Sequence, residues 1–233
     1  MNKEIQKLLG EAKSKMNGYV ALLSFRYSNL CVKADPVALL PVLVIIDGEE
    51  KNIEEVAEVS IPKDDVLAVV PKDSELLFDI GKGVKKAHPE FKMDLVQKEG
   101  SDDEDDKYLT FTMPEVNKDR HDVLEEGVDG LHDQCKARVN LVLDQYGVKR
   151  AKYMAGADAE SIDYVKDQLQ GLHKFFDDLM EKLTEGKKKE IEDAYQLYLA
   201  EQQQKQQEKQ EQDAAHGSGM GMSMKIDDLL NNG

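Results

Sequence analysis

The chain changes character at Leu109-Thr110-Phe111-Thr112-Met113-Pro114-Glu115-Val116-Asn117-Lys118-Asp119-Arg120, where a strand-like run meets a proline and then a helical pattern. The converse change, from helical pattern to strand-like run, reads Val32-Lys33-Ala34-Asp35-Pro36-Val37-Ala38-Leu39-Leu40. Proline disfavours helix in the residue before it and cannot lie inside a helix, so Pro36 and Pro114 mark two boundaries. We therefore expect a strand-rich insert within a helical body, with hinges at Ala34, Asp35 and Pro36 and at Met113 and Pro114.

Three segments outside the insert carry apolar residues at helical spacing. The first starts near the N-terminus, the second follows Asn117 as its N-cap, and the third follows Asp158 as its N-cap. In the third segment the apolar residues alternate in steps of three and four, which is the seam of helices that pack nearly parallel or antiparallel. The pattern predicts a long three-helix bundle made of residues 1–35 and 115–212.

Residues 36–114 follow a different pattern. Ser74 is the expected cap of a short helix that ends before Pro89, and turn signals separate the apolar runs around it. Four β-branched or aromatic runs read as strands, at 42–46, 56–61, 66–70 and 108–112. These signals predict a small β/α/β domain inserted after the first helix, so the expected fold class is α+β. Residues 213–233 read as a flexible Gly/Met tail whose short apolar cluster suggests a docking peptide for a protein partner.

Acidity is concentrated in the insert. The chain of 233 residues has a net charge of -16, and residues 36–115 hold 20 acidic and 9 basic side chains. The first 35 residues hold 6 basic and 3 acidic side chains. Cys31 and Cys135 lack any paired spacing, which favours reduced structural thiols in a cytosolic protein. The N-terminus lacks the apolar core of a signal peptide, and the longest apolar run is too short to span a bilayer, so we expect a soluble cytoplasmic protein without membrane contact.

No catalytic, metal or cofactor constellation emerges from the motifs. His132 and Cys135 lie one helical turn apart, but no second pair completes a zinc site, so packing roles are favoured for both. Gly81-Lys82-Gly83 lacks the strand-loop-helix setting of a phosphate loop. The acidic run at 102–106 lacks the spacing and central glycine of a calcium loop. We therefore expect a protein that is not an enzyme and holds no cofactor or metal.

Short motifs at particular spacings add a further indication. They are Ala34-x-Pro36, a strand ending in Asp47-Gly48, Pro71-x-Asp73, Ile80-x-Lys82-x-Val84 and Pro114-x-Val116-Asn117-x-Asp119-Arg120. In their order and spacing, over residues 3–190, the chain resembles the ribosome recycling factor family. That resemblance implies a factor that recycles bacterial-type ribosomes after termination and splits the subunits with elongation factor G. It also implies a bundle lying against large-subunit rRNA, a small domain that swings about the hinge, and no covalent chemistry or DNA binding.

The chain departs from the family where the family carries arginines. Before the first hinge, an arginine-glycine pair and a second arginine are replaced by Leu30-Cys31-Val32-Lys33. In the second helix, an ungapped alignment places Asn140-Leu141-Val142-Leu143-Asp144 where the family has Arg-Asn-Val-Arg-Arg. Phosphate neutralisation supplies most RNA affinity, and asparagine or leucine cannot replace the guanidinium fork. These losses weaken the implied rRNA contact.

Two hypotheses follow from the residues that remain. The first is a recycling-type translation factor whose candidate rRNA contacts are Lys33, Lys136, Arg138, Lys149 and Lys152. Arg138, Lys149 and Lys152 fall on one side of the second helix, since eleven and fourteen residues at 100° each return to within about 40°. The alternative is a diverged paralogue that kept the scaffold as a protein-protein interaction module. Its interface would be apolar and formed by Val139, Leu141 and Leu143.

Overall fold

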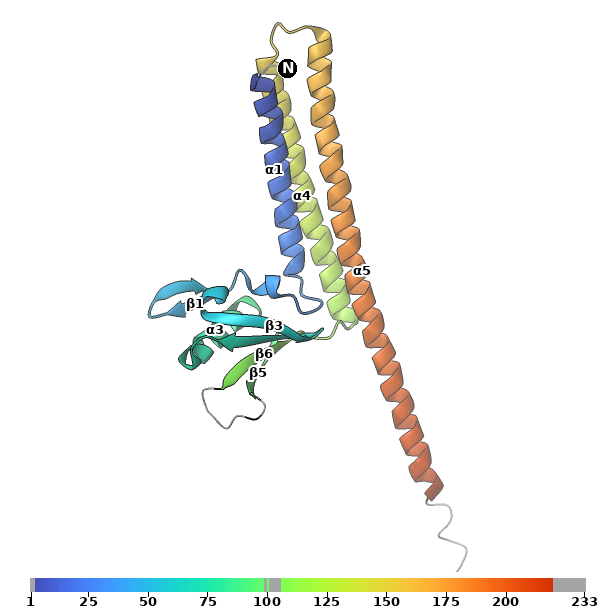
Figure 1. Ribbon diagram of the computed structural model, residues 1–233. Coiled ribbons are helices and arrows are strands. Elements are labelled where there is room, and N and C mark those ends of the chain that lie inside the picture. The colour runs from blue at the N-terminus through green and yellow to red at the C-terminus, as the bar shows by residue number, and fades with distance from the viewer. Residues whose placement is uncertain (1–2, 99, 101–105, 220–233) are drawn as a thin grey trace, which may run out of the picture.

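Three long helices form the body of the protein. The computed structural model describes residues 3–98, 100 and 106–219. Helices α1 (Lys3–Ser28), α4 (Lys118–Tyr153) and α5 (Ala159–Gly219) lie side by side, and α5 then continues alone past the start of α4 (Figure 1). The Asn117 side chain caps α4 by accepting a hydrogen bond from the Arg120 N–H at 2.9 Å, and Asp158 accepts one from the Ser161 N–H at 2.8 Å. Both caps agree with the sequence prediction.

The core of the bundle combines an apolar seam with one buried polar network. Its fully buried side chains come from all three helices and include Met16, Leu23, Val128, Val139, Tyr146, Phe176, Met180 and Ile191. Within this core the Tyr27 hydroxyl lies 3.0 Å from the Thr184 hydroxyl, and His132 Nδ1 lies 2.9 Å from the same Thr184 oxygen. The network therefore joins α1, α4 and α5 at one level. His132 and Cys135 are both buried, the latter as a free thiol.

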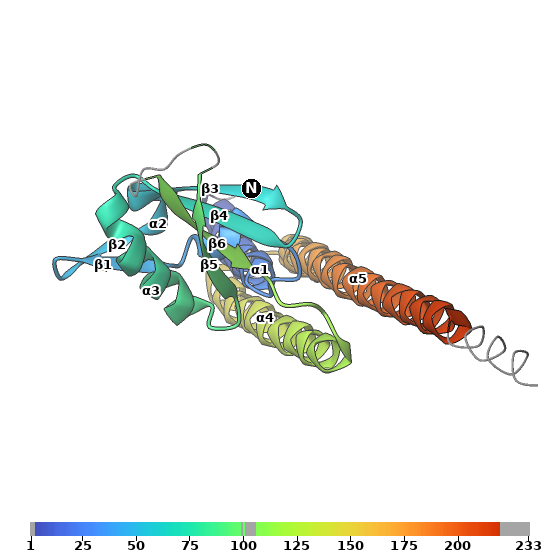
Figure 2. The ribbon, with the colours of Figure 1, turned by 90° about the horizontal axis from the view of Figure 1, so that it is seen from below.

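The insert folds as a small lobe beside one end of α1 (Figures 1 and 2). Its elements are η1 (Pro36–Leu39), β1 (Leu43–Ile46), β2 (Glu49–Asn52), α2 (Ile53–Val56), β3 (Ala57–Lys63), β4 (Val66–Pro71), η2 (Ser74–Leu76), α3 (Leu77–Ala87), β5 (Lys92–Gln97) and β6 (Lys107–Thr112). β1 and β2 form a hairpin, and the antiparallel sheet has the order β3-β4-β6-β5. A second hydrophobic core lies inside this lobe, with Leu39, Leu67, Ile80, Phe91 and Phe111 fully buried.

Close packing holds α3 against the β1–β2 hairpin. A Cβ atom added at Gly83 would lie 2.9 Å from the Leu43 carbonyl oxygen, so only glycine permits this approach. The Gly81-Lys82-Gly83 run thus lies within a helix that packs on strands. At the end of α3, His88 Nε2 lies 2.9 Å from the Ala38 carbonyl oxygen, and the His88 ring stacks on Phe91.

The α+β prediction is confirmed, whereas several element boundaries differ. Strands β2 and β5 were not expected from the sequence. The cap of η2 is Asp73, which accepts a hydrogen bond from the Glu75 N–H at 3.1 Å, rather than Ser74. α5 continues to Gly219, beyond the expected boundary at residue 212. The rest of the predicted tail, 220–233, lies outside the described residues, as does most of the acidic run at 102–106.

Candidate functional site

The Arg120 guanidinium binds both segments, the connectors, that join the bundle to the lobe. Arg120, in the first turn of α4, donates from Nη1 to the Pro114 carbonyl oxygen at 2.7 Å and from Nη2 to the Cys31 carbonyl oxygen at 2.6 Å. Hydrogen bonds from a charged donor are among the stronger ones in proteins. The two connectors are therefore tied to the bundle at one point, which we call the Arg120 clamp.

On the lobe side, the β3–β4 turn holds both connectors. The Ala34 N–H donates to the Asp64 carbonyl oxygen at 2.7 Å, and the Met113 N–H donates to the Asp65 carbonyl oxygen at 2.8 Å. Asp35 accepts a hydrogen bond from the Val37 N–H at 2.9 Å and thereby caps η1. The predicted hinge residues Ala34, Asp35 and Met113 are thus bonded into the lobe.

Between these two sets of bonds, each connector keeps only a short segment that the bonds do not fix. In the first connector the segment is Val32-Lys33, between the clamped Cys31 and the bonded Ala34. In the second it is the Met113–Pro114 linkage alone. Pro36 is the first residue of η1 and belongs to the lobe.

Burial shapes the electrostatics of this junction. Desolvation lowers the pKa of Arg120, and the nearby Glu90 carboxylate opposes that shift. Burial raises the pKa of the Cys31 thiol to about 11, and the Glu90 charge adds to the rise. Cys31 is therefore a protonated, unreactive thiol at neutral pH, since the thiolate is the nucleophile.

Basic side chains gather where α1 and α4 meet, on a surface that we call the basic face. The Arg138 guanidinium lies 5.7 Å from the centre of the Tyr19 ring. Lys149 Nζ lies 4.4 Å and Lys15 Nζ 5.5 Å from the centre of the Tyr146 ring. The basic face comprises Lys7, Lys15, Arg26, Arg138, Lys149 and Lys152, placed by these ring contacts, by the hollows that they line and, for Lys152, by helical spacing.

The basic face also holds two carboxylates, Glu4 and Glu11, which line one hollow together with Lys7 and Lys149. Arg26 Nη1 donates to the neutral Gln134 side chain at 3.2 Å. Lys149 Nζ lies 4.0 Å from a Glu11 carboxylate oxygen, and both side chains are nearly half exposed, so solvent screens this pair. The cations of this face outnumber its carboxylates, and positive charge at an exposed helix surface suits phosphate contact.

Lys136 and Lys33 lie elsewhere. Lys136 is on the α5 side of α4, where its Nζ lies 3.5 Å from Asp177 and 3.7 Å from Glu181. Its charge is thus used in helix pairing rather than on the basic face. Lys33 is exposed in the first connector and lines a hollow of about 270 Å³ beside Lys187. Of the five predicted contacts, Arg138 and Lys149 lie over tyrosine rings of the basic face, and Lys152 shares their side of α4 by helical spacing.

Of the three positions in α4 at which the resembling family carries arginines, two make contacts within the bundle and the third, Asp144, is exposed. The His173 Nε2–H donates to the Asn140 side-chain oxygen at 2.6 Å, and Leu143 packs against the bundle core. Leu143 lies about 140° around α4 from Arg138, because five residues advance 500°. The basic face is therefore a different side of α4 from the one marked by these positions.

The predicted apolar interface does not form a surface. Val139 is fully buried, and Leu143 is half-buried against the core, whereas Leu141 is 53% exposed. From the sequence, the helical turn at Val139 to Leu143 is apolar on nearly all sides. Which of these sides is covered depends on how α4 packs against α1 and α5, and the sequence alone does not fix that packing. Only Leu141 remains available to a partner in this arrangement.

Arg120 had no predicted role, and Lys7, Lys15 and Arg26 were not among the predicted contacts. Arg120 was visible as the end of the Pro114-to-Arg120 motif, and side chains in a first helical turn point back toward the N-terminus. That direction would have indicated the connectors. The ring contacts of Lys15 depend on which helices pair, and no local spacing reveals them.

Residues 3–98, 100 and 106–219 contain no group of three or more histidine, cysteine, aspartate or glutamate side chains arranged to hold a metal ion. Over the same ranges, no helix combines the length and apolarity needed to cross a membrane.

Comparisons with known proteins converge on one family. A sequence model described as "Ribosome recycling factor" matches residues 27–191. The ribosome-recycling factor of Caldicellulosiruptor bescii is 24% identical over 185 residues, which cover 77% of this chain and 95% of that protein. The corresponding protein of Caldicellulosiruptor saccharolyticus is 23% identical over 185 residues, with the same coverage.

Solved structures show the same fold. A solution structure of the ribosome recycling factor superposes with a TM-score of 0.65 at 19% identity and covers 83% of this chain and 100% of that chain. A second match, with a TM-score of 0.55 at 18% identity, covers 80% of this chain and 98% of that chain. It comes from models of the T. thermophilus ribosome recycling factor and E. coli elongation factor G bound to the E. coli post-termination complex.

Proposed function

The chain belongs to the ribosome recycling factor family, and from this membership we propose that it binds the ribosome after termination and helps to release it for reuse. The observation that carries the proposal is the family match over residues 27–191, which includes both connectors and the start of α5. The partner in this step is elongation factor G, which shares the post-termination complex with a recycling factor in one structural relative. The work takes place in the cytoplasm and involves no covalent chemistry.

The hinge is the mechanical part of this function. The Arg120 clamp fixes the bundle side of both connectors, and the β3–β4 turn fixes the lobe side. Rotation of the lobe is therefore concentrated in Val32-Lys33 and in the Met113–Pro114 linkage. Proline locks φ of Pro114 and also restricts ψ of Met113 before it, so ψ of Pro114 is the least restricted torsion of the second connector. Because the two short segments lie at the same level, the lobe should rotate about a single axis.

The basic face is the proposed contact with large-subunit rRNA. Arg138, Lys149 and Lys152 carry the interaction on α4, supported by the cations of α1. The α5 side of α4 has little to offer phosphate, because Asn140 and Lys136 are engaged with His173, Asp177 and Glu181. Affinity should therefore be modest and should fall steeply with salt.

Sedimentation with isolated large subunits tests this contact. The variant Arg138→Glu/Lys149→Glu/Lys152→Glu should lose co-sedimentation at about 0.15 M salt, because repulsion replaces three phosphate contacts. The matched control Lys166→Glu/Lys174→Glu/Lys182→Glu makes the same charge change at exposed positions of α5 and should sediment like the unmodified protein. Equal loss in both variants would contradict the assignment of the face.

The paralogue alternative makes the opposite forecast. If the scaffold serves a protein partner, the unmodified chain will not sediment with subunits, and Leu141→Asp will disrupt a complex. The burial of Val139 and Leu143 reduces that interface to a single exposed leucine, so the structure favours the ribosomal proposal.

A further inference from the structure

A groove of about 650 Å³ lies between the lobe and α5. One wall is the β3–β4 turn at Asp64 and Asp65, and the other is α5 from Gly186 to Glu201. The floor is formed by the two connectors, including Val32 and Met113. This volume lies within the range of about 300–1,000 Å³ typical of pockets that enclose small ligands, so it suits a few side chains rather than a whole domain.

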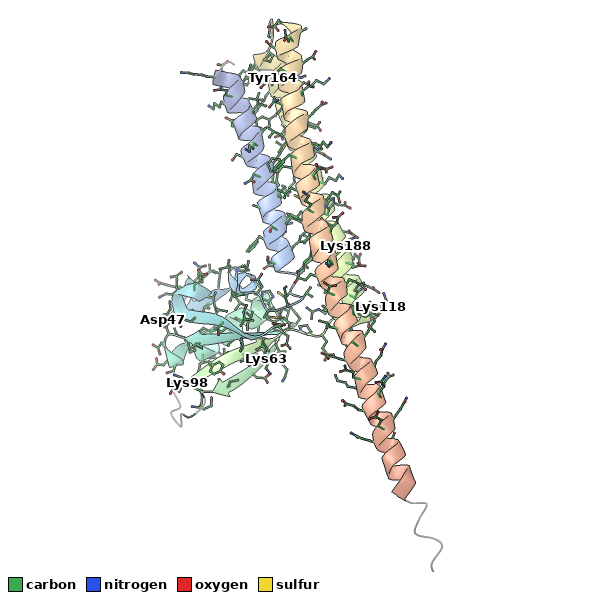
Figure 3. The ribbon with its side chains drawn as sticks, turned by 45° about the vertical axis from the view of Figure 1, so that its right-hand side comes forward. Asp47, Lys63, Lys98, Lys118, Tyr164 and Lys188 are labelled. Atoms are coloured by element: carbon green, nitrogen blue, oxygen red, sulfur yellow. The ribbon has the colours of Figure 1, made fainter. Side chains whose placement is uncertain are left out.

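Much of the α5 wall lies beyond the part of the chain that matches the family. The match ends at residue 191, whereas Ala194, Leu197 and Tyr198 all line the groove. Leu197 is 67% exposed, and Tyr198 is half-buried. The start of α4 still lies beside α5 at Glu192 and Tyr195, and α5 continues alone past it (Figures 1 and 3). Leu197 and Tyr198 therefore offer apolar surface to an occupant of the groove.

The rim of the groove is strongly acidic. Six carboxylates and two lysines line it, so the groove carries a net negative charge and attracts cations. This charge excludes RNA, because phosphate would meet carboxylates from both sides. It also disfavours a second copy of this chain, whose net charge is -16. The chain's own residues 220–233, which lie outside the described residues, carry one lysine and two aspartates and do not complement it.

We propose that this groove binds a basic peptide segment of a partner protein, with lysine or arginine side chains at the rim and an apolar side chain against Leu197 and Tyr198. The two walls belong to different bodies, since one moves with the lobe and the other is part of the bundle. A bound segment that touches both walls therefore fixes the angle between them. Binding at the groove thus sets the position of the lobe, independently of any contact made by the basic face.

Fluorescence anisotropy with a labelled peptide of Lys-Leu-Lys-Ala repeats tests the binding step on the full chain. The groove variant Asp65→Asn/Asp193→Asn/Glu201→Gln should weaken binding about tenfold, because three partly exposed charge contacts are lost. The control Asp133→Asn/Glu208→Gln/Glu211→Gln removes the same charge at exposed positions elsewhere and should change affinity by less than about twofold. Equal weakening in both variants would reveal diffuse attraction to an acidic protein and overturn the proposal.

Two further measurements address the apolar wall and the lobe angle. Leu197→Ser leaves the charge unchanged and should weaken the peptide about threefold; unchanged affinity would contradict the apolar contact. Energy transfer between dyes at Lys63→Cys and Gln206→Cys should show a narrower distance distribution when the peptide binds, and an unchanged distribution would overturn the control of the lobe angle. The groove variant should still sediment with large subunits, so this proposal and the proposed function can fail separately.

Discussion

Arg120 shows how much of the hinge depends on one side chain. Its position at the end of a sequence motif was visible, but its two acceptors are backbone carbonyls from segments far apart in sequence. Backbone acceptors leave no trace in residue identity, so only the folded chain reveals the clamp. The predicted hinge residues Ala34, Asp35, Pro36, Met113 and Pro114 mark the correct neighbourhood, and their role in motion stays a prediction.

Replacement of Arg120 by methionine should loosen the lobe and weaken the fold. Two charge-assisted hydrogen bonds would be lost and two carbonyls left without their donor, so unfolding free energy should fall by about 1.5–3 kcal/mol, measured by urea denaturation. Alkylation of Cys31 at about pH 8 should also accelerate, because its thiol is protected by burial at the clamped connector.

Lys118→Met provides the control for this substitution. Lys118 lies two residues away and pairs with Asp122 at the surface, where solvent screens the pair, so its removal should leave the urea midpoint almost unchanged. An Arg120→Met protein with unchanged stability and unchanged Cys31 reactivity would show that the connectors do not depend on the clamp.

His121 adds a pH-dependent tie between the start of α4 and α5. Its Nδ1 lies 3.1 Å from Asp122 and its Nε2 lies 3.0 Å from Glu192. The hydrogen bond with Asp122 raises the pKa of His121 above its ordinary value of 6.5, and the bond with Glu192 adds to the rise. The stabilisation is fully present below the unfolded-state pKa of about 6.5 and is lost as pH rises through the higher folded-state pKa.

His121→Gln should therefore cost stability mainly at low pH. The loss of unfolding free energy caused by this substitution should be larger at pH about 5.5 than at pH about 8.5, by about 0.2–1 kcal/mol. The effect is small because solvent screens the partner carboxylates, which are about half exposed. Thermal melts of both proteins across this range provide the measurement. A gap that grows with rising pH would have the wrong sign for this account.

At the scale of elements, the strongly periodic helices were predictable and the edge strands were not. α1, α4 and α5 follow from apolar periodicity and from caps at Asn117 and Asp158. β2 reads Glu-Glu-Lys-Asn, with no apolar or β-branched residue, and it exists because it pairs with β1 across the Asp47-Gly48 turn. β5 is an edge strand that pairs only with β6, so tertiary pairing decides its structure.

The polar network around Thr184 should set the relative position of the three helices. Thr184→Val leaves the Tyr27 hydroxyl and His132 Nδ1 without a shared partner in the core, so unfolding free energy should fall by about 1–3 kcal/mol in denaturant titrations. Tyr27→Phe removes one member of the same network. The double variant should cost less than the sum of the two, whereas strict additivity would show that the groups act separately.

Gly83 should be intolerant of a side chain because α3 lies directly on β1. Gly83→Ala places a methyl group 2.9 Å from the Leu43 carbonyl, so the lobe should lose about 1–3 kcal/mol in spite of the better helix propensity of alanine. Gly130→Ala, in α4 with open space around it, should instead gain up to about 1 kcal/mol. Hydrogen exchange on lobe amides would locate the loss, and equal protection in both variants would contradict this packing argument.

At the scale of the molecule, the arrangement of charge separates two surfaces. Cations collect where α1 and α4 meet, while carboxylates line the groove between the lobe and α5. Helical spacing places Arg138, Lys149 and Lys152 on one side of α4, and their contact with rRNA stays a prediction. Spacing could not show that Lys136 pairs with α5 or that Leu143 packs against the bundle core, because both depend on how the helices pair. The domain boundaries at 35 and 115 stay a prediction about independent folding.

Recycling itself can be measured as the rate at which post-termination ribosomes split into subunits, followed by light scattering with elongation factor G and GTP. This chain should accelerate splitting, and Arg138→Glu/Lys149→Glu/Lys152→Glu should reduce the rate at least about tenfold through lost phosphate contacts. The α5 control Lys166→Glu/Lys174→Glu/Lys182→Glu should split ribosomes at the unmodified rate. Splitting no faster than with elongation factor G alone, or equal loss in both variants, would contradict this account.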